Sequence, residues 1–162
     1  SNNIMIQLFI KETDIAELTG FSGNIDADSI KPAINVAQTT HLKRILGQSL
    51  YDKISTEIEN NTLSGDYLTI YNDYIVYMTA FFSASIYLSL NTSKTTNAGT
   101  YKLSPDNATS SSNNEVVILG NNYKAIATSY EDNFREFMKT ISIPEWTSTE
   151  NTKSSTNILN WY

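Results

Sequence analysis

The chain contains no cysteine and a single histidine, His41, in 162 residues. Without cysteine, no disulfide can stabilise the fold, and thiolate metal sites and cysteine nucleophiles are excluded. One histidine cannot supply a histidine-rich metal cluster. The fold must therefore depend on an apolar core. Hydrophobic residues make up 40% of the chain, which is enough for one domain of this length.

Positive charge is also scarce. The formal net charge is −6, and Arg44 and Arg135 are the only arginines. A protein that grips duplex DNA neutralises several phosphates with lysine and arginine, and this chain lacks the required surplus. Tight general binding of nucleic acid is therefore not expected.

Signals for export or membrane insertion are absent as well. The first residues, "SNNIMIQLFIKET", show neither a basic start nor a small-residue cleavage site. The longest apolar run, "YIVYMTAFFSASIYLSL" from Tyr74 to Leu90, falls short of a membrane span and is interrupted by serine and threonine. We expect this run to form a buried helix and expect no contact with a membrane.

Apolar periodicity predicts an all-α fold, a small bundle of four to five helices. Residues 4–10 form a short strand or extended segment, and helices follow within 13–20, 29–47, 49–60 and 66–90, with a final long helix from 115 to 141. Thr13 is a candidate N-cap of the first helix, and Asp26, Asp28 and Ser29 are candidates for the second. Pro32 requires that the second helix begin close to Ser29.

The stretch "RILGQSLYDKI" from Arg44 to Ile54 predicts a tight corner between two helices. Gly47 follows the apolar stripe from Ile30 to Ile45, and a glycine after a helix end commonly adopts a positive φ angle. Ser49 can cap the helix that starts immediately afterwards.

Two segments lack a core-facing pattern. Residues 92–114, rich in serine, threonine and asparagine, predict a long loop or β-hairpin insertion. Residues 142–162 begin beside Pro144 and predict an extended C-terminal arm. We therefore divide the chain into a helical domain, 1–141, and an arm, 142–162.

Candidate catalytic and metal-binding residues are few, and each has a simpler structural explanation. His41 lies on an apolar stripe and is expected to be a partly buried, hydrogen-bonded ring. Ser22 lacks the final spacing of a nucleophile elbow. The sequence "DADSI" from Asp26 starts like a calcium loop, but Lys31 and Ala37 stand where that loop needs glycine and glutamate.

The remaining polar clusters give no better site. Glu131, Asp132 and Glu136 are expected on the solvated face of the last helix. The sequence "ILGNNYK" has one glycine and no phosphate-binding spacing. We expect no catalytic residue, no cofactor and no metal, and hence no enzyme.

The corner at Gly47 could also belong to a helix-turn-helix, with residues 49–60 as the recognition helix. That helix would present Asp52, Glu57 and Glu59 to DNA, and its charge is unfavourable for a major-groove element. A monomeric helical regulatory or DNA-binding module remains the alternative hypothesis.

Taken in order, "IMIQLFIKETDIAELTGF", "IDADSIKPAINVAQTTHLKRILGQSLYDKI", the aromatic helix and the last helix resemble a known family. The similarity is to head–tail connector, or adaptor, proteins of tailed bacteriophages, particularly those of crAss-like and related phages of Bacteroides-type hosts. It covers roughly residues 4–90. The matching residues are Asp26, Asp28, Ile34, Ala37, Ile45, Leu46, Gly47, Leu50 and Tyr51.

The resemblance implies a structural virion protein that forms a ring, usually twelvefold, beneath the portal protein. Such a ring joins capsid to tail, contacts further neck or tail proteins and lets double-stranded DNA pass without sequence-specific binding. The implied location is the neck of a virion assembled in the host cytoplasm. An acidic chain suits a channel to which DNA should not adhere.

Apolar and aromatic residues in the two polar segments are the candidate partner-binding groups, because such side chains commonly anchor interfaces. They are Tyr101, Leu103, Trp146, Ile158, Leu159, Trp161 and Tyr162. The girth of the helix from Asp66 to Leu90 also exceeds what one face of a bundle buries, so we expect it to contribute to contacts between subunits.

Overall fold

The computed structural model describes residues 6–21, 25–99 and 106–146, with side chains described outside 92–99 and 106–113. Every regular element in these ranges is helical, which confirms the all-α prediction. The elements are α1 (Asp14–Thr19), α2 (Ala27–Ala37), η1 (Gln38–Leu42), α3 (Lys43–Asn60), α4 (Gly65–Ile70), η2 (Tyr71–Ile75), α5 (Val76–Gly99) and α6 (Asp106–Met138), where η denotes a π-helix.

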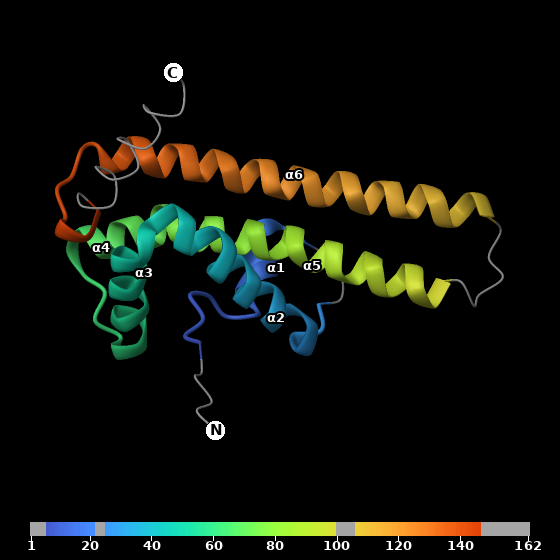
Figure 1. Ribbon diagram of the computed structural model, residues 1–162, viewed down its shortest axis with the longest axis horizontal. Helices are drawn as coiled ribbons and strands as arrows, with labels where there is room; N and C mark the ends of the chain where they lie inside the picture. The colour runs from blue at the N-terminus through green and yellow to red at the C-terminus, as the bar shows by residue number, and fades with distance from the viewer. Residues whose placement is uncertain (1–5, 22–24, 100–105, 147–162) are drawn as a thin grey trace, which may run out of the picture.

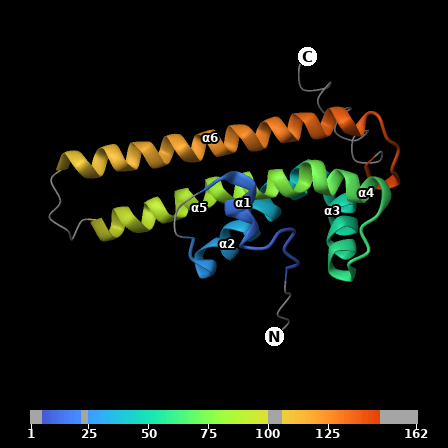
Figure 2. The ribbon, with the colours of Figure 1, turned by 180° about the vertical axis from the view of Figure 1, so that it is seen from behind.

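The long helices α5 and α6 form an antiparallel hairpin that spans the molecule (Figure 1). Helices α1 and α2 pack on the other side of α5, and the opposite view shows the same arrangement (Figure 2). Helix α5 is therefore the central element, with α6 on one side and α1 and α2 on the other. Most of its apolar girth is taken up within the chain.

The start of α2 follows from capping. Asp26 is the N-cap, and its carboxylate accepts hydrogen bonds from the backbone N–H of Asp28 and the hydroxyl of Ser29, both at 3.1 Å. The helix begins at Ala27, two residues before the predicted start, so Pro32 lies in its second turn. Thr13 makes no side-chain cap at α1. Asp14 accepts from the backbone N–H of Lys11 instead.

The predicted corner at Gly47 is confirmed. This residue has φ 76° and ψ 159° and breaks α3 into two helical pieces that meet at a kink. The positive φ was expected, but the ψ value differs from that of a left-handed helical cap. It belongs to an extended region that is essentially restricted to glycine, because a side chain there would clash with the backbone. Helix α3 consequently turns away from the line of α2 (Figure 1).

The predicted loop or hairpin at 92–114 is wrong over most of its length. Helix α5 continues to Gly99 and α6 begins at Asp106, directly after Pro105. Serine, threonine and asparagine cost only a few tenths of a kcal/mol each in a helix, so two long helices in contact can carry them. The break coincides with Gly99 and Pro105, which are stronger helix breakers than the polar residues around them.

Candidate interaction surface

Two π-helices hold the extended N-terminal segment in place at Phe9. The backbone N–H of Phe9 donates to Oε1 of Gln38 at 2.7 Å, and its carbonyl accepts from the hydroxyl of Tyr71 at 2.6 Å. Gln38 opens η1 and Tyr71 opens η2. The Gln38 amide also donates to the carbonyl of Gln7 at 2.9 Å. A single glutamine thus replaces a neighbouring strand for residues 7–9.

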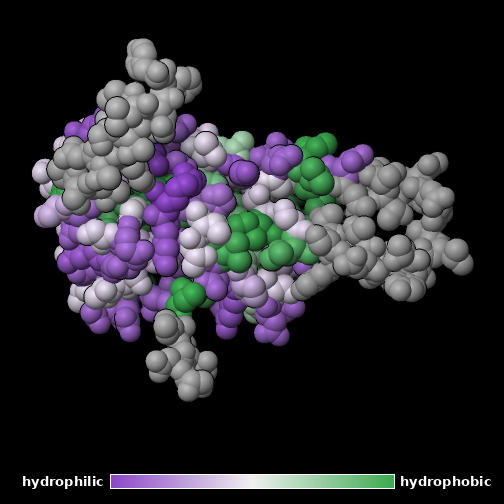
Figure 3. All heavy atoms as spheres, in the orientation of Figure 1, coloured by the Kyte–Doolittle hydropathy of each residue, from purple (hydrophilic) through white to green (hydrophobic). Residues whose placement is uncertain are grey.

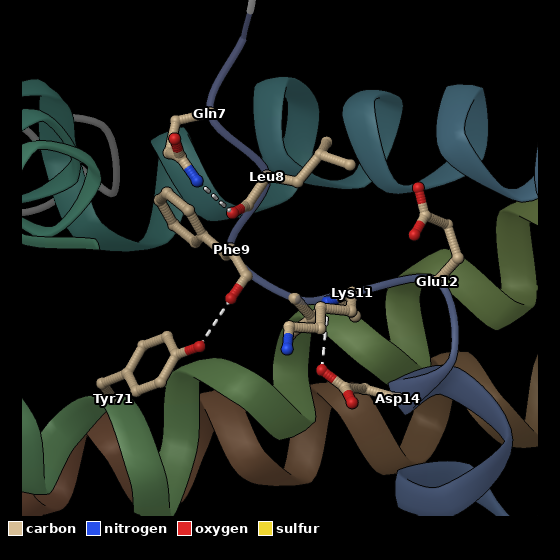
Figure 4. A pocket seen from close by; sticks show the side chains of 8 residues that line it. Gln7, Leu8, Phe9, Lys11, Glu12, Asp14 and Tyr71 are labelled. Atoms are coloured by element: carbon tan, nitrogen blue, oxygen red, sulfur yellow. Dashed lines mark hydrogen bonds between the residues drawn. The ribbon is translucent and has the colours of Figure 1, made fainter. Parts of the chain in front are cut away.

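An open hollow of about 270 Å³ lies beside this segment, lined by residues 7–12, Asp14 and Tyr71 (Figure 4). Its polar groups largely bond to one another: Lys11 donates its backbone N–H to Asp14 at 3.0 Å, and Tyr71 donates to Phe9. Burial raises the pKa of Tyr71, and the nearby Asp14 raises it further, which keeps the hydroxyl protonated as a donor. These hydrogen bonds hold the N-terminal segment in place beside the hollow.

Both arginines of the chain meet at one carboxylate. Arg44 donates to both oxygens of Glu131 at 3.1 Å each, and Arg135 donates to Glu131 Oε2 at 3.2 Å. Burial alone would raise the pKa of Glu131, but hydrogen bonds and attraction from Arg44 and then Arg135 hold this pKa below its usual 4.5. This network joins α3 to α6 and engages both guanidinium groups with protein.

Glu131 therefore differs from its predicted role as a solvated residue, since its side chain is only 13% exposed. Asp132 and Glu136 are exposed as predicted, and Glu136 pairs with Lys139 on the surface. The helical periodicity placed all three residues away from the core, but it could not reveal that Arg44 of another helix reaches Glu131.

His41 is a half-buried ring, as predicted. It stacks on Phe82 with ring centres 4.0 Å apart and planes at 6°, and its Nδ1 lies 3.4 Å from Arg44. Burial lowers the pKa of His41, and repulsion from Arg44 and Lys124 lowers it further, while Glu131 partly opposes the shift. Stacking on Phe82 makes the ring a packing element between the helices.

The beginning of the predicted C-terminal arm packs on its own bundle. Trp146 is 7% exposed and meets Phe134 edge-on at 5.3 Å, and Ile143 is also buried. Glu145 accepts from the hydroxyl of Tyr67 at 2.7 Å, and burial, followed by this bond, raises the pKa of Tyr67 to about 12. Trp146, predicted to bind a partner, thus places most of its apolar area within the chain.

The other predicted partner-binding residues lie outside the described residues: Tyr101, Leu103, Ile158, Leu159, Trp161 and Tyr162. What the structure does expose is a surface that the sequence prediction overlooked. We call it the outer apolar surface and define it by Val117, Ile118, Leu119 and Ile126 of α6, which are 37–59% exposed and lie on more than one side of that helix. Figure 3 shows hydrophobic side chains at the surface of the molecule near the first half of α6.

The signal for this surface was present in the sequence as the run "VVIL" from Val116 to Leu119. Four consecutive apolar residues on a helix cannot all face one partner, so some must be exposed or contact another molecule. Gln38 and Tyr71 gave no comparable signal, because no composition rule identifies a π-helix. Gln38 is not one of the apolar residues of the stripe from Ile30 to Ile45, yet it is fully buried.

Within the described ranges, no three histidine, aspartate or glutamate side chains form a group that could hold a metal ion. In the same part of the chain, no helix has the length and hydrophobicity needed to cross a membrane. The outer apolar surface is therefore taken as the candidate interaction surface of the described residues.

Comparison with known proteins gives one assignment. No curated protein and no solved structure matches the chain. One family model matches residues 42–156, more than two thirds of the chain, and covers α3 to α6 together with part of the C-terminal segment. The chain therefore belongs to the family described as "Family of unknown function (DUF6712)".

Proposed function

We propose that this protein is a head–tail connector of a tailed bacteriophage, a ring subunit that docks beneath the portal and continues the DNA channel towards the tail. The proposal starts from the sequence resemblance, whose residues Ile45, Leu46, Gly47 and Leu50 lie at the kink of α3. Ile45, Leu46 and Leu50 are fully buried there, so the resemblance rests on residues that determine how α3 leaves the bundle.

The observation that carries the proposal is the outer apolar surface. Large groups of exposed apolar side chains are uncommon on monomeric proteins. Where they occur, they commonly mark a site of contact with another molecule. A subunit of an assembly needs such a surface, whereas an enzyme needs converging polar groups. The polar groups described here are engaged in holding the fold, as the bonds around Phe9 and Glu131 illustrate.

Electrostatics agrees with DNA passage rather than DNA binding. The chain carries a net charge of −6, and Arg44 and Arg135 both donate to Glu131. The alternative of a helix-turn-helix module gains no support from α3, where Asp52 and Glu59 are exposed and Lys53 pairs with Glu57 at 2.8 Å. A duplex approaching this helix would meet mostly negative charge.

Negative-stain electron microscopy tests the proposal with the full chain, alone and mixed with the portal protein encoded by the same genome. In the mixture we expect a ring of this chain stacked coaxially on the portal ring. This result is expected even if the chain forms no ring by itself. A matched sample with an unrelated portal should give no complex. Failure to bind its own portal, together with absence of the chain from purified virions by mass spectrometry, would refute the connector function.

A further inference from the structure

Helix α3 is anchored on either side of Gly47 by different parts of the chain. Before this residue, Ile45 is fully buried, and Arg44 donates to both oxygens of Glu131 in α6 at 3.1 Å. The first piece of α3 is therefore joined to the α5–α6 hairpin. Gly47, with φ 76° and ψ 159°, interrupts the helical backbone between this piece and the second piece, residues 48–60.

The second piece of α3 is joined to the N-terminal segment through Tyr51. Its ring lies 4.9 Å from the ring of Phe9, and its hydroxyl accepts a hydrogen bond from Nε2 of Gln38 at 3.2 Å. The same Gln38 side chain bonds to the backbone of Gln7 and Phe9. Both rings are buried, so this contact is part of the core. Residues 6–12, which we call the strap, thus lie against the second piece.

The other contacts of the second piece restrict its direction less. Leu50 and Ile54 are fully buried, but apolar packing has no preferred direction. Lys53 lies 5.1 Å from the ring centre of Tyr67, and its side chain is 36% exposed, so water weakens this contact. A ring contact and a hydrogen bond within the core fix an orientation more strictly, because both depend on distance and angle.

The strap itself has an open side. The hollow of about 270 Å³ lies beside residues 7–12, so the strap faces open space there (Figure 4). Its first residue, Ile6, is 43% exposed, whereas Phe9 is buried. Side chains of Gln38 and Tyr71 hold its backbone in place of the ladder of a sheet. A segment held in this manner can detach locally without the loss of a helix or a sheet.

We infer that the strap controls the direction of α3. While the strap is bound, residues 48–60 keep the direction shown in Figure 1, and when it detaches, they turn about Gly47 relative to the hairpin. Glycine suits such a hinge because it accepts backbone angles that other residues rarely adopt. The non-helical residues 61–64 that follow can adjust to the movement. Asp52 and Glu59 are exposed on the turning piece, so a molecule that displaces the strap would also reorient these charges. The inference is independent of the connector function.

Pairs of spin labels test this control in the full chain, which contains no cysteine of its own. In the α3 pair, Glu59→Cys and Ser129→Cys report the distance from the second piece of α3 to α6. In the η1 pair, Thr39→Cys and Ser129→Cys report the distance from η1, before the hinge, to α6. All three side chains are exposed. With no other substitution, double electron–electron resonance should give one narrow distance distribution for each pair.

Phe9→Ala removes the ring that contacts Tyr51. It should broaden the distribution of the α3 pair by about twofold or more and leave that of the η1 pair unchanged. Ile15→Ala is the matched control, because Ile15 is also fully buried but belongs to α1, which packs on α5. This control should leave both distributions narrow. Tyr51→Leu removes the same contact from the side of α3, keeps an apolar side chain, and should broaden the α3 pair alone.

Two results would overturn the inference. An unchanged α3 pair in the variants would show that the other contacts of the second piece fix its direction. Equal broadening of both pairs, or the same broadening in Ile15→Ala, would show a general loosening of the bundle. Circular dichroism establishes that each variant is folded, and if Phe9→Ala does not fold, Tyr51→Leu decides between these results.

Discussion

The two ends of the α5–α6 hairpin are built from similar apolar residues but lie in different surroundings. At the inner end, Phe134 contacts Tyr74 and Trp146, and Tyr77 stacks on Tyr130 with ring centres 4.8 Å apart. At the outer end, Val117 and Ile118 are more than half exposed. An apolar helix face becomes core or interface according to whether a third element covers it.

The same comparison explains which part of α5 could serve assembly. Its apolar girth predicted that the helix from Asp66 to Leu90 contributes part of the contacts between subunits, and within it Met78, Phe82 and Ala84 are buried against elements of the same chain. Leu90 is exposed, at the outer end. Most exposed large apolar residues of this hairpin end therefore belong to α6 and not to α5.

The largest expected difference between the two ends is in stability. Phe134→Ala removes a fully buried ring from the inner end and should lower the free energy of unfolding by about 3–5 kcal/mol. Ile118→Ala at the outer end should change it by less than about 0.5 kcal/mol, as for ordinary surface positions. Urea denaturation of both variants at low protein concentration measures the difference. Comparable losses would mean that the outer end is covered in the free chain.

Asp26 and Gly47 were the parts of the fold most readily predicted from sequence, because their effects are local, although Thr13 does not make the predicted cap. Asp26 begins α2 through bonds to residues two and three positions later, and Gly47 breaks α3 through its own backbone angles. Trp146 could not be placed in the same way. The sequence of a polar segment that contains one aromatic residue is the same whether that residue binds a partner or, as here, packs on Phe134.

Gln38 and the outer apolar surface illustrate the remaining limit. The role of Gln38 depends on residues 29 and 31 positions away in the chain, and such distant pairings leave no periodic signal. The exposure of Val117 depends on which sides of α6 other elements of the chain cover. Both are consequences of tertiary packing rather than of local preference, so a helical pattern alone cannot give them.

A second prediction compares the loss of stability when a buried glutamine, Gln38, or an exposed one, Gln48, is replaced by alanine. Gln38→Ala leaves the N–H of Phe9 and the carbonyl of Gln7 without their partner, at a cost of about 1–3 kcal/mol for each group. Gln48→Ala removes only an exposed bond to Asp52 and should be nearly neutral. Thermal unfolding gives both values. Hydrogen exchange at Phe9 should also accelerate in the first variant, and protection that persists there would show that the N-terminal segment is held by other contacts.

A smaller effect is expected at the kink of α3. Gly47→Ala forces a side chain into φ 76° and ψ 159° and should cost about 1–3 kcal/mol. Gly65→Ala is the control, since its φ of 57° also favours glycine but no atom lies within 4 Å of the added methyl group, and about 1 kcal/mol is expected. If Gly47→Ala had the same melting temperature as the parent protein, the kink would not require glycine and α3 would have another path.

The smallest expected effect is the change of stability in acid, which should depend on His41 and Glu131. The pKa of His41 is lowered from 6.5, chiefly by burial and then by Arg44, so the folded state favours the neutral ring. The stability that this provides is complete above pH 6.5 and declines as the pH falls below that value towards the folded pKa. The pKa of Glu131 is lowered from 4.5, so its contribution is complete above pH 4.5 and is lost further into acid.

Melting temperatures should therefore be level between pH 8 and 7 and begin to fall below pH 6.5, with a further fall below pH 4.5. His41→Phe keeps an aromatic ring against Phe82 and should remove the first decline, whereas Glu131→Gln should reduce the second. Hydrogen exchange locates the effect: acid should first weaken protection around Phe82, on which His41 stacks, and then around Glu131. An unchanged first decline in His41→Phe would mean that another group controls it, and the stacked histidine would then have no part in the response to pH.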